Sequence, residues 1–171
     1  MQSCSSSFAL KITAMLGQLK TEQIEEFLSN HIIGHLGCHA DGKSYVVPIS
    51  YAFDGDHIYC HTHEGKKIEM MRKNPSVCFQ VDDLHDLSNW NSVVLWGRFE
   101  ELHNDKDRND ALQILMNRSL PFNSSSLTQL GANWPFSPAD TRDIKGIVFR
   151  IRIEEKTGRF ESTMQSPALP G

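Results

Sequence analysis

The chain has 171 residues, which is enough for one domain with a sizeable hydrophobic core. Hydrophobic residues make up 39% of it and charged residues 22%, as in ordinary globular proteins, so a disordered chain is not expected. The net charge of -4 argues against nucleic acid as the main partner, and no apolar run reaches the ~18 residues that a membrane span needs.

The two ends of the chain are expected to lie outside the domain. The opening MQSCSSSFALKITAMLG lacks the basic start and clean apolar run of a signal peptide. We therefore expect a disordered leader over 1–14 (or a true start at Met15), a single domain over 15–164 and a flexible tail over 165–171. The four cysteines show no C-x-x-C spacing, so reduced thiols and a cytoplasmic location are expected, with an oxidised pair as the alternative.

The first part of the domain predicts one helix followed by three antiparallel strands. Thr21 is placed to cap a short helix in which Ile24, Phe27 and Leu28 share one face. Two Asp-Gly pairs, which strongly favour hairpins, then separate three strand-like runs. These runs are 32–40, 44–53 and 57–62.

The second part alternates helices and strands less regularly. A helix over 64–73 is ended by Asn74-Pro75, and a helix over 105–117 carries an apolar stripe of Ala111, Leu112 and Leu115. The remaining strands are expected over 76–81, 92–102, 144–153 and 158–162, with polar or irregular segments over 82–89 and 118–143. Many short antiparallel strands with few helices indicate a closed or partly closed β-barrel with helices packed outside.

The strand over 44–53 has one large face and one small face. Tyr45, Val47, Ile49, Tyr51 and Phe53 alternate with the smaller set, and the larger set suits a core. The smaller set is Ser44, Val46, Pro48, Ser50 and Ala52. Small side chains would let a flat molecule approach the backbone, and a proline there has no N–H for a neighbouring strand. An edge strand whose outer face is merely small is the alternative.

The segment HTHEGKK, from His61 to Lys67, joins a strand end to a helix start. His61 and His63 share a strand face, as two metal ligands can, but further ligands are only scattered and no metal site is expected. Lys66 and Lys67 lie at a helix N-terminus, where the dipole favours negative charge and free N–H groups suit phosphate. The corner therefore indicates an anion site, with a solvated turn as the alternative.

The segment WNSVVLWGR, from Trp90 to Arg98, begins with an aromatic residue at a strand entrance. Val93, Leu95 and Phe99 share one face of this strand, and Trp96 and Arg98 share the other. Taken alone, these are interpreted as core and interface residues.

Three blocks together resemble the flavin-binding split-barrel proteins related to pyridoxamine 5'-phosphate oxidase, and most closely the nitroimidazole-resistance-like subgroup. The blocks are IGHLGCHADGKSYVVPISYAFDGDHIYCHTHEGKKIEMMRKNPSVCFQVD, WNSVVLWGRFEEL and GIVFRIRIEEKTGRFE. The resemblance implies a mainly β fold with flanking helices, namely a six-stranded antiparallel split β-barrel of the FMN-binding type. It also implies a homodimer with FMN at the subunit interface.

The resemblance also implies a set of cofactor-binding positions. Val46, Val47, Pro48, Ile49 and Ser50 would line the isoalloxazine ring. His61, Thr62, Lys66 and Lys67 would hold the phosphate, while Trp90 and Ser92 would reach the flavin from the partner chain. His61 is the positional match to a histidine near the flavin in nitroimidazole reductases, and so the one candidate catalytic residue.

The expected function is that of an FMN-dependent oxidoreductase that passes electrons from a reduced nicotinamide to a small, flat acceptor. The arginine-rich motifs of true pyridoxamine phosphate oxidases are not found, so oxidation of vitamin B6 is not expected. A non-catalytic flavin- or heme-binding protein of the same fold is the alternative.

Overall fold

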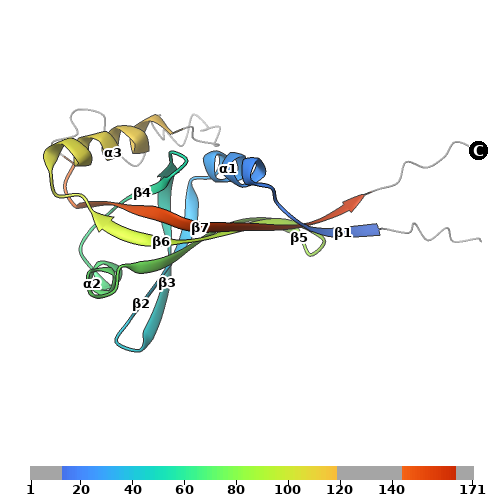
Figure 1. The fold of residues 1–171 in the computed structure, drawn as a ribbon, viewed down its shortest axis with the longest axis horizontal. Helices are drawn as coiled ribbons and strands as arrows, with labels where there is room; N and C mark the ends of the chain where they lie inside the picture. Colours follow the sequence, from blue (N-terminus) through green and yellow to red (C-terminus); the bar gives the residue numbers. More distant parts are fainter. Residues whose placement is uncertain (1–12, 119–143, 165–171) are drawn as a thin grey trace, which may run out of the picture.

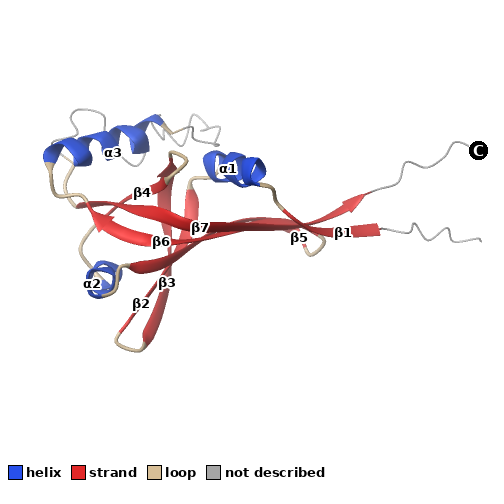
Figure 2. Cartoon of the chain, viewed as in Figure 1, coloured by secondary structure: helices blue, strands red, loops and turns tan. Residues whose placement is uncertain are grey.

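The protein forms one antiparallel β-sheet with three helices, seen in a computed structural model that describes residues 13–118 and 144–164 (Figures 1 and 2). The predicted irregular segment over 118–143 lies outside the described residues except for Arg118, as do most of the predicted leader and tail. The elements are β1 (Thr13–Gln18), α1 (Thr21–Asn30), β2 (Ile33–Ala40), β3 (Lys43–Phe53), β4 (His57–Thr62), α2 (Lys66–Lys73), β5 (Ser76–Asp86), β6 (Asn89–Glu101), α3 (Asp105–Asn117) and β7 (Ile147–Met164).

Six of the strands close into a ring. The sheet order is β1-β7-β4-β3-β2-β5-β6, and β6 pairs again with β7. β1 lies outside the ring and pairs with the last residues of β7, from Arg159 to Met164. The expected mainly β fold, a six-stranded antiparallel barrel with flanking helices, is confirmed.

The barrel interior is filled by the alternate residues of each strand. Leu36, Tyr51, Phe79, Leu95 and Phe149, one from each of five strands, are all fully buried. This follows from the period of two along a strand, which sends every second side chain to the same face. The Tyr51 hydroxyl donates a hydrogen bond of 2.8 Å to the Leu28 carbonyl, which satisfies its polar end and ties α1 to the barrel.

The three helices cover different parts of the barrel surface (Figure 1). Ile24 and Leu28 of α1 belong to the main core, whereas α2 packs mainly against β2. α3 forms a second apolar cluster with the outer face of the barrel, through Leu112 and Leu115 against Ala52, Tyr59 and Val148. The predicted apolar stripe of this helix is confirmed.

The Asp41-Gly42 pair forms the predicted hairpin between β2 and β3. Both residues have positive φ, of 52° and 73°, and Ala40 pairs directly with Lys43. Two positive φ values in a two-residue loop define the turn whose twist matches the flanking strands, and Asp-Gly is a preferred sequence for it. The local sequence therefore determines the register of β3 against β2.

Two predicted strand boundaries, in β5 and β7, are wrong. The polar stretch after Val81 continues as strand to Asp86, and the expected strand pair at the end of the chain is one strand of 18 residues. Both stretches gain backbone hydrogen bonds from β6. Asp82 pairs with Ser92 of that strand, and Lys156 pairs with Leu95. Their polar composition suggested loops, because composition alone does not show that a distant strand pairs with them.

Three smaller expectations also differ from the structure. β1 was not predicted as a strand, and Tyr45 is 38% exposed because it lies near the free end of the β2–β3 hairpin. Thr21 is the first residue of α1, and Lys20 takes the cap position instead. The Gln23 side chain accepts a 2.9 Å hydrogen bond from the Lys20 N–H, so a residue of the first helical turn satisfies the backbone N–H of the cap residue.

Candidate functional site

The predicted flavin-binding residues border the place where β3 and β4 separate. The pairing of these strands runs from Phe53 with Ile58 to Tyr51 with Cys60, and ends there. Beyond that pair, β3 continues through Ser50 to Lys43 with only β2 beside it, whereas β4 continues through His61 and Thr62 beside β7. The gap between the diverging strands therefore has Ser50 on one side and His61 on the other.

The Gly65-Lys66-Lys67 corner follows directly after β4. Gly65 caps α2, and a side chain placed on it would meet no atom within 4 Å, so the space before the first helical turn is open. Lys66 pairs loosely with Glu69 at 3.9 Å, and Lys67 forms no ion pair with the described residues. Free N–H groups, two lysines and open space together fit a bound anion such as phosphate.

The corner lies beside the barrel, because α2 packs mainly against β2, the strand that pairs with β3. Burial raises the pKa of the Cys38 thiol on β2, and the charge of Lys67 opposes that rise. The corner and the open edge of β3 therefore belong to one region of the molecule.

His61 is held in a defined orientation at the end of β4. Its Nε2 lies 2.7 Å from the Lys145 carbonyl, which can only accept, so this nitrogen carries the proton. Burial lowers the pKa of His61 below its usual value, and the neighbouring His63 and Arg108 lower it further against the effect of that hydrogen bond. The ring is therefore neutral at physiological pH.

Gly146 makes this close packing around His61 possible. It has a φ of 109°, and a side chain there would lie 2.6 Å from the Thr62 carbonyl and 2.9 Å from the His61 ring. Only glycine combines that backbone conformation with such a close approach. The Arg108 side chain also donates to the Gly146 carbonyl at 3.1 Å, which fixes the loop from outside.

The five predicted ring-lining residues of β3 divide between two faces. Val46, Pro48 and Ser50 point to the outer face, and Val46 is 65% exposed. Val47 and Ile49 pack in the barrel core, so they can contribute only backbone atoms to a ligand outside it. Pro48 lies where β3 has β2 on one side and no strand on the other, which is where a missing N–H costs no pairing.

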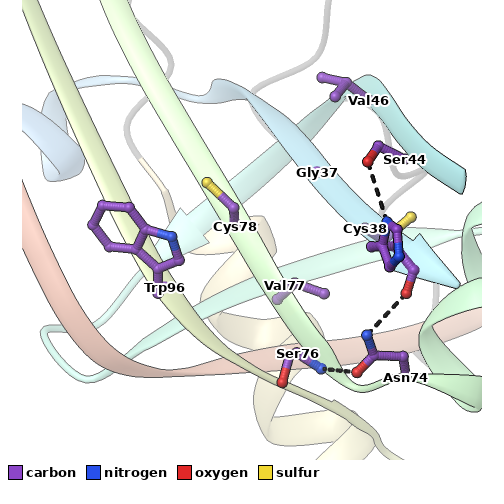
Figure 3. Close-up of a pocket in the computed structure, with 10 residues that line it drawn as sticks. Gly37, Cys38, Ser44, Val46, Asn74, Ser76, Val77, Cys78 and Trp96 are labelled. Carbon is purple, nitrogen blue, oxygen red and sulfur yellow. Dashed lines mark hydrogen bonds between the residues drawn. The ribbon is translucent and has the colours of Figure 1, made fainter. Parts of the chain in front are cut away.

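A groove of about 340 Å³ continues from Val46 across the outer face of the barrel (Figure 3). Its floor includes Gly37, which has Val46 on one neighbouring strand and Cys78 on the other. Trp96 follows Cys78 on β6 and is 43% exposed. The sequence interpretation missed this groove because its residues come from four strands, though the exposed Val46 and the Trp96 face were both visible as a pattern.

Trp90 and Ser92 do not reach the corner within one chain. Both belong to β6, which is separated from β3 by β2 and β5, a distance of roughly 14 Å at the usual strand spacing. The Trp90 indole donates to Glu161 at 3.1 Å, and Ser92 accepts from Gln80 at 3.4 Å. Their predicted contact with flavin therefore requires a second chain.

Arg72 makes contacts that its place in the sequence did not suggest. It lies in the last turn of α2, and its guanidinium group binds Glu64 and Glu101 at once. The hydrogen bond from Arg72 holds the pKa of Glu101 below its usual range. The corner is therefore connected to the end of β6.

The described residues contain neither a metal-binding cluster nor a helix that could cross a membrane. Over 13–118 and 144–164, no group of three or more His, Cys, Asp or Glu side chains is arranged to hold a metal ion. The helices in those ranges are also too short or too polar to cross a membrane.

Comparison with known proteins assigns the chain to a family. The family model described as pyridoxamine 5'-phosphate oxidase matches residues 20–160. A relative from Rhizobium meliloti (strain 1021), the uncharacterized protein RA0666, is 30% identical over 149 residues, covering 82% of this chain and 92% of that protein.

Solved structures give the same result. A FAD-binding protein from Mesorhizobium loti is 32% identical, with a TM-score of 0.65 over 88% of this chain and 99% of that one. A putative 5-nitroimidazole antibiotic resistance protein from Bacteroides thetaiotaomicron VPI-5482 shares the fold, with a TM-score of 0.67 and 18% identity over 95% and 98% of the two chains. This chain is a member of the pyridoxamine 5'-phosphate oxidase family and has its split-barrel fold.

Proposed function

We propose that this protein is a flavoprotein that binds FMN at the split between β3 and β4. The isoalloxazine ring would lie along the outer face of β3, against Val46, Pro48 and Ser50. The phosphate would bind the Gly65-Lys66-Lys67 corner, with Thr62 and His61 beside it.

The observation that carries this proposal is the meeting of an exposed strand edge and an anion corner in one gap. β3 offers a small-faced edge with no strand beside it, and the corner offers N–H groups and two lysines within the same region. A flat ring with an anionic tail needs both features together. The FAD-binding relative from Mesorhizobium loti, at 32% identity, also supports a flavin.

FMN is proposed because it ends in a single phosphate group, which one helix start with two lysines would suffice to bind. FAD, which has the same ring and continues from a pyrophosphate to an adenosine, is the alternative. Both flavins predict a yellow protein, and identification of the released molecule by mass separates them.

We further propose that the protein acts as a homodimer, with the flavin between subunits. The exposed apolar side chains on the outer barrel face support this, because Ile33, Val46 and Trp96 are 49%, 65% and 43% exposed. A second copy packed on this face would also bring its own Trp90 and Ser92 toward the flavin. The dimer thereby accounts for two predicted site residues that one chain leaves distant.

The proposed activity is transfer of electrons from a reduced nicotinamide to a small, flat acceptor. When bound, the flavin supplies the redox chemistry, and the protein binds it, orients it and tunes its electronics. His61, beside the phosphate, would present a neutral imidazole to the flavin, with its Nε2 proton donated to the Lys145 carbonyl. The acceptor would enter through the groove beside Val46. In the dimer, the partner chain would narrow that groove and so limit the size of the acceptor.

The test is an absorbance spectrum of the purified full-length protein, followed by addition of reduced nicotinamide. We expect a flavin spectrum that bleaches with the donor and returns with an acceptor. Flavin that stays oxidised with every donor would favour the non-catalytic alternative, and a Soret band on hemin titration would favour heme binding. A colourless protein whose melting temperature does not rise with FMN would disprove the proposal.

A further inference from the structure

Arg72 forms a bridge between two carboxylates that lie on different elements. Its Nη1 and Nη2 donate to Glu64 at 3.1 and 2.8 Å, and its Nε and Nη2 donate to Glu101 at 2.8 Å each. Both carboxylates are therefore bound through both of their oxygens. Such bidentate contacts fix the orientation of both carboxylates as well as neutralising their charge, which the single ammonium group of a lysine could not do.

Glu64 is the residue in this bridge that bears on the anion corner. It directly precedes Gly65, the cap of α2, and its side chain is 64% exposed. A free carboxylate at that position would compete with a phosphate for the helix N–H groups and for Lys66 and Lys67, because the same field attracts both. It would also repel a phosphate bound nearby.

Glu101 gives the bridge its fixed end. This residue is the last of β6, and its side chain is only 13% exposed. Through Arg72, it ties the last turn of the eight-residue helix α2 to the barrel wall. The position of the helix start depends on this contact, because so short a helix has little stability of its own.

We infer that Arg72 is a positioning residue of the phosphate corner: it occupies both oxygens of Glu64 and anchors α2 to β6, so that the corner is open to an external anion. This inference rests on the proposed function. Since Arg72 is bound to Glu64 and Glu101, its main effect is expected on the phosphate and through Glu64, while the Glu101 contact holds the guanidinium group in place.

A purely local role for Arg72 would make a different prediction. Lys73 lies next to it at the same helix end and pairs with Asp41 on the hairpin. If Arg72 only supplied positive charge at the helix C-terminus, loss of Lys73 would have the same consequence. Lys73→Met is therefore the matched control for the change in net charge.

The experiment compares FMN with riboflavin, which has the same ring and no phosphate. Dissociation constants of both are measured by quenching of flavin fluorescence for the full chain and its variants, with melting temperatures of the flavin-free proteins alongside. The variants are Arg72→Met, Glu64→Gln, Arg72→Met with Glu64→Gln, and Lys73→Met. Arg72→Lys replaces Arg72→Met should the latter fail to fold, and is expected to show a smaller loss in the same direction.

We expect Arg72→Met to raise the Kd of FMN about tenfold, because one compensating charge is lost at a partly exposed site. The Kd of riboflavin should change by less than about twofold. Addition of Glu64→Gln should restore most of the FMN affinity, because the competing carboxylate is then gone. Lys73→Met should bind both flavins like the wild type.

Three results would overturn the inference while leaving the proposed function intact. These are FMN binding by Arg72→Met as tight as in the wild type, equal loss of FMN and riboflavin, and no recovery with Glu64→Gln. If the wild type bound FMN no more tightly than riboflavin, the corner would not contribute to phosphate binding, and the inference about Arg72 would also be overturned. A wild type that binds neither flavin would disprove the proposed function itself.

Discussion

At the scale of single residues, the corner between β4 and α2 is defined by charge and by space. Lys66 and Lys67 stand where the helix dipole disfavours them, and Gly65 leaves the space before them open. An arrangement that is unfavourable in the empty protein is compensated when an anion binds. The two lysines are therefore the residues whose substitution tests the corner most directly.

Reversal of both charges, Lys66→Glu with Lys67→Glu, is expected to weaken FMN by about 3 kcal/mol, roughly a hundredfold in Kd. Charge-assisted contacts to the phosphate are lost, and repulsion replaces them. Fluorescence titration measures the change. The control, Lys20→Glu with Lys106→Glu, makes the same change in net charge on other elements, before α1 and on α3. Equal affinity of both double variants would mean that the phosphate binds elsewhere.

His61 predicts a dependence of stability on pH. Because its pKa is lowered in the folded protein, the unfolded chain binds more protons, and stability contributed by the neutral ring falls as the pH drops below about 6.5. His61→Gln keeps a donor for Lys145 and cannot be protonated. In flavin-free protein, the fall in melting temperature between about pH 7.5 and 5.5 should therefore be smaller in this variant.

The control for this measurement is His85→Gln, because His85 is exposed on the β5–β6 hairpin. It should show the same acid sensitivity as the wild type. If His61→Gln also matched the wild type, the histidine would not be a source of that sensitivity.

At the scale of elements, the closure of β6 on β7 depends on Gly97. The register between these strands shifts at Trp96 and Gly97, so that Glu155 pairs with Trp96 and Ile153 with Gly97. A side chain on Gly97 would lie 2.3 Å from the Arg152 carbonyl oxygen, which is backbone and cannot move independently. The bulge and the glycine together allow an 18-residue strand to follow the curve of the barrel.

Gly97→Ala is expected to lower the free energy of unfolding by about 1–3 kcal/mol, because the strands must move apart to admit a methyl group. Urea denaturation measures this. Gly65→Ala is the matched control, since the space around Gly65 is open, and it should change stability by less than about 0.5 kcal/mol. Similar losses in both variants would contradict the role given to the bulge.

The element scale also shows which parts of the fold were predictable. β4 and α3 have the predicted bounds, since each has a clear period and clear turn residues at its ends. β5 and β7 were predicted too short, because Asp83 and Lys156 are held in strands by partners on β6. Polar residues in strands depend on pairing between distant segments, which no local pattern records.

At the scale of the whole molecule, the barrel has one outer face that is unusually apolar. Ile33, Val46 and Trp96, from β2, β3 and β6, are all at least 43% exposed on it. Exposed side chains of this size in one area are typical of an interface. The proposed dimer would cover them and complete the flavin site in the same step.

Val46→Asp is expected to shift the protein from a dimer toward the 19.4 kDa monomer, because a carboxylate would be buried without a partner in the interface. Sedimentation velocity measures the mass, and flavin should be lost together with the dimer. Lys106→Asp, on the exposed side of α3, places a carboxylate on the surface away from this face and should leave the mass unchanged. A Val46→Asp dimer as stable as the wild type would mean that another face forms the interface.

The sequence by itself determined the strand and helix types, the Asp-Gly hairpin and the alternation that fills the barrel, because turn chemistry and side-chain periodicity are local. It also placed two lysines at a helix start, which indicated an anion. Only the tertiary structure decided that Val46 borders a groove whose other residues come from β2, β5 and β6. It also decided that Arg72 contacts Glu101, 29 residues further along the chain, and so links Glu101 to Glu64. Such contacts depend on how strands close into a ring, and that closure follows from pairing over the whole chain.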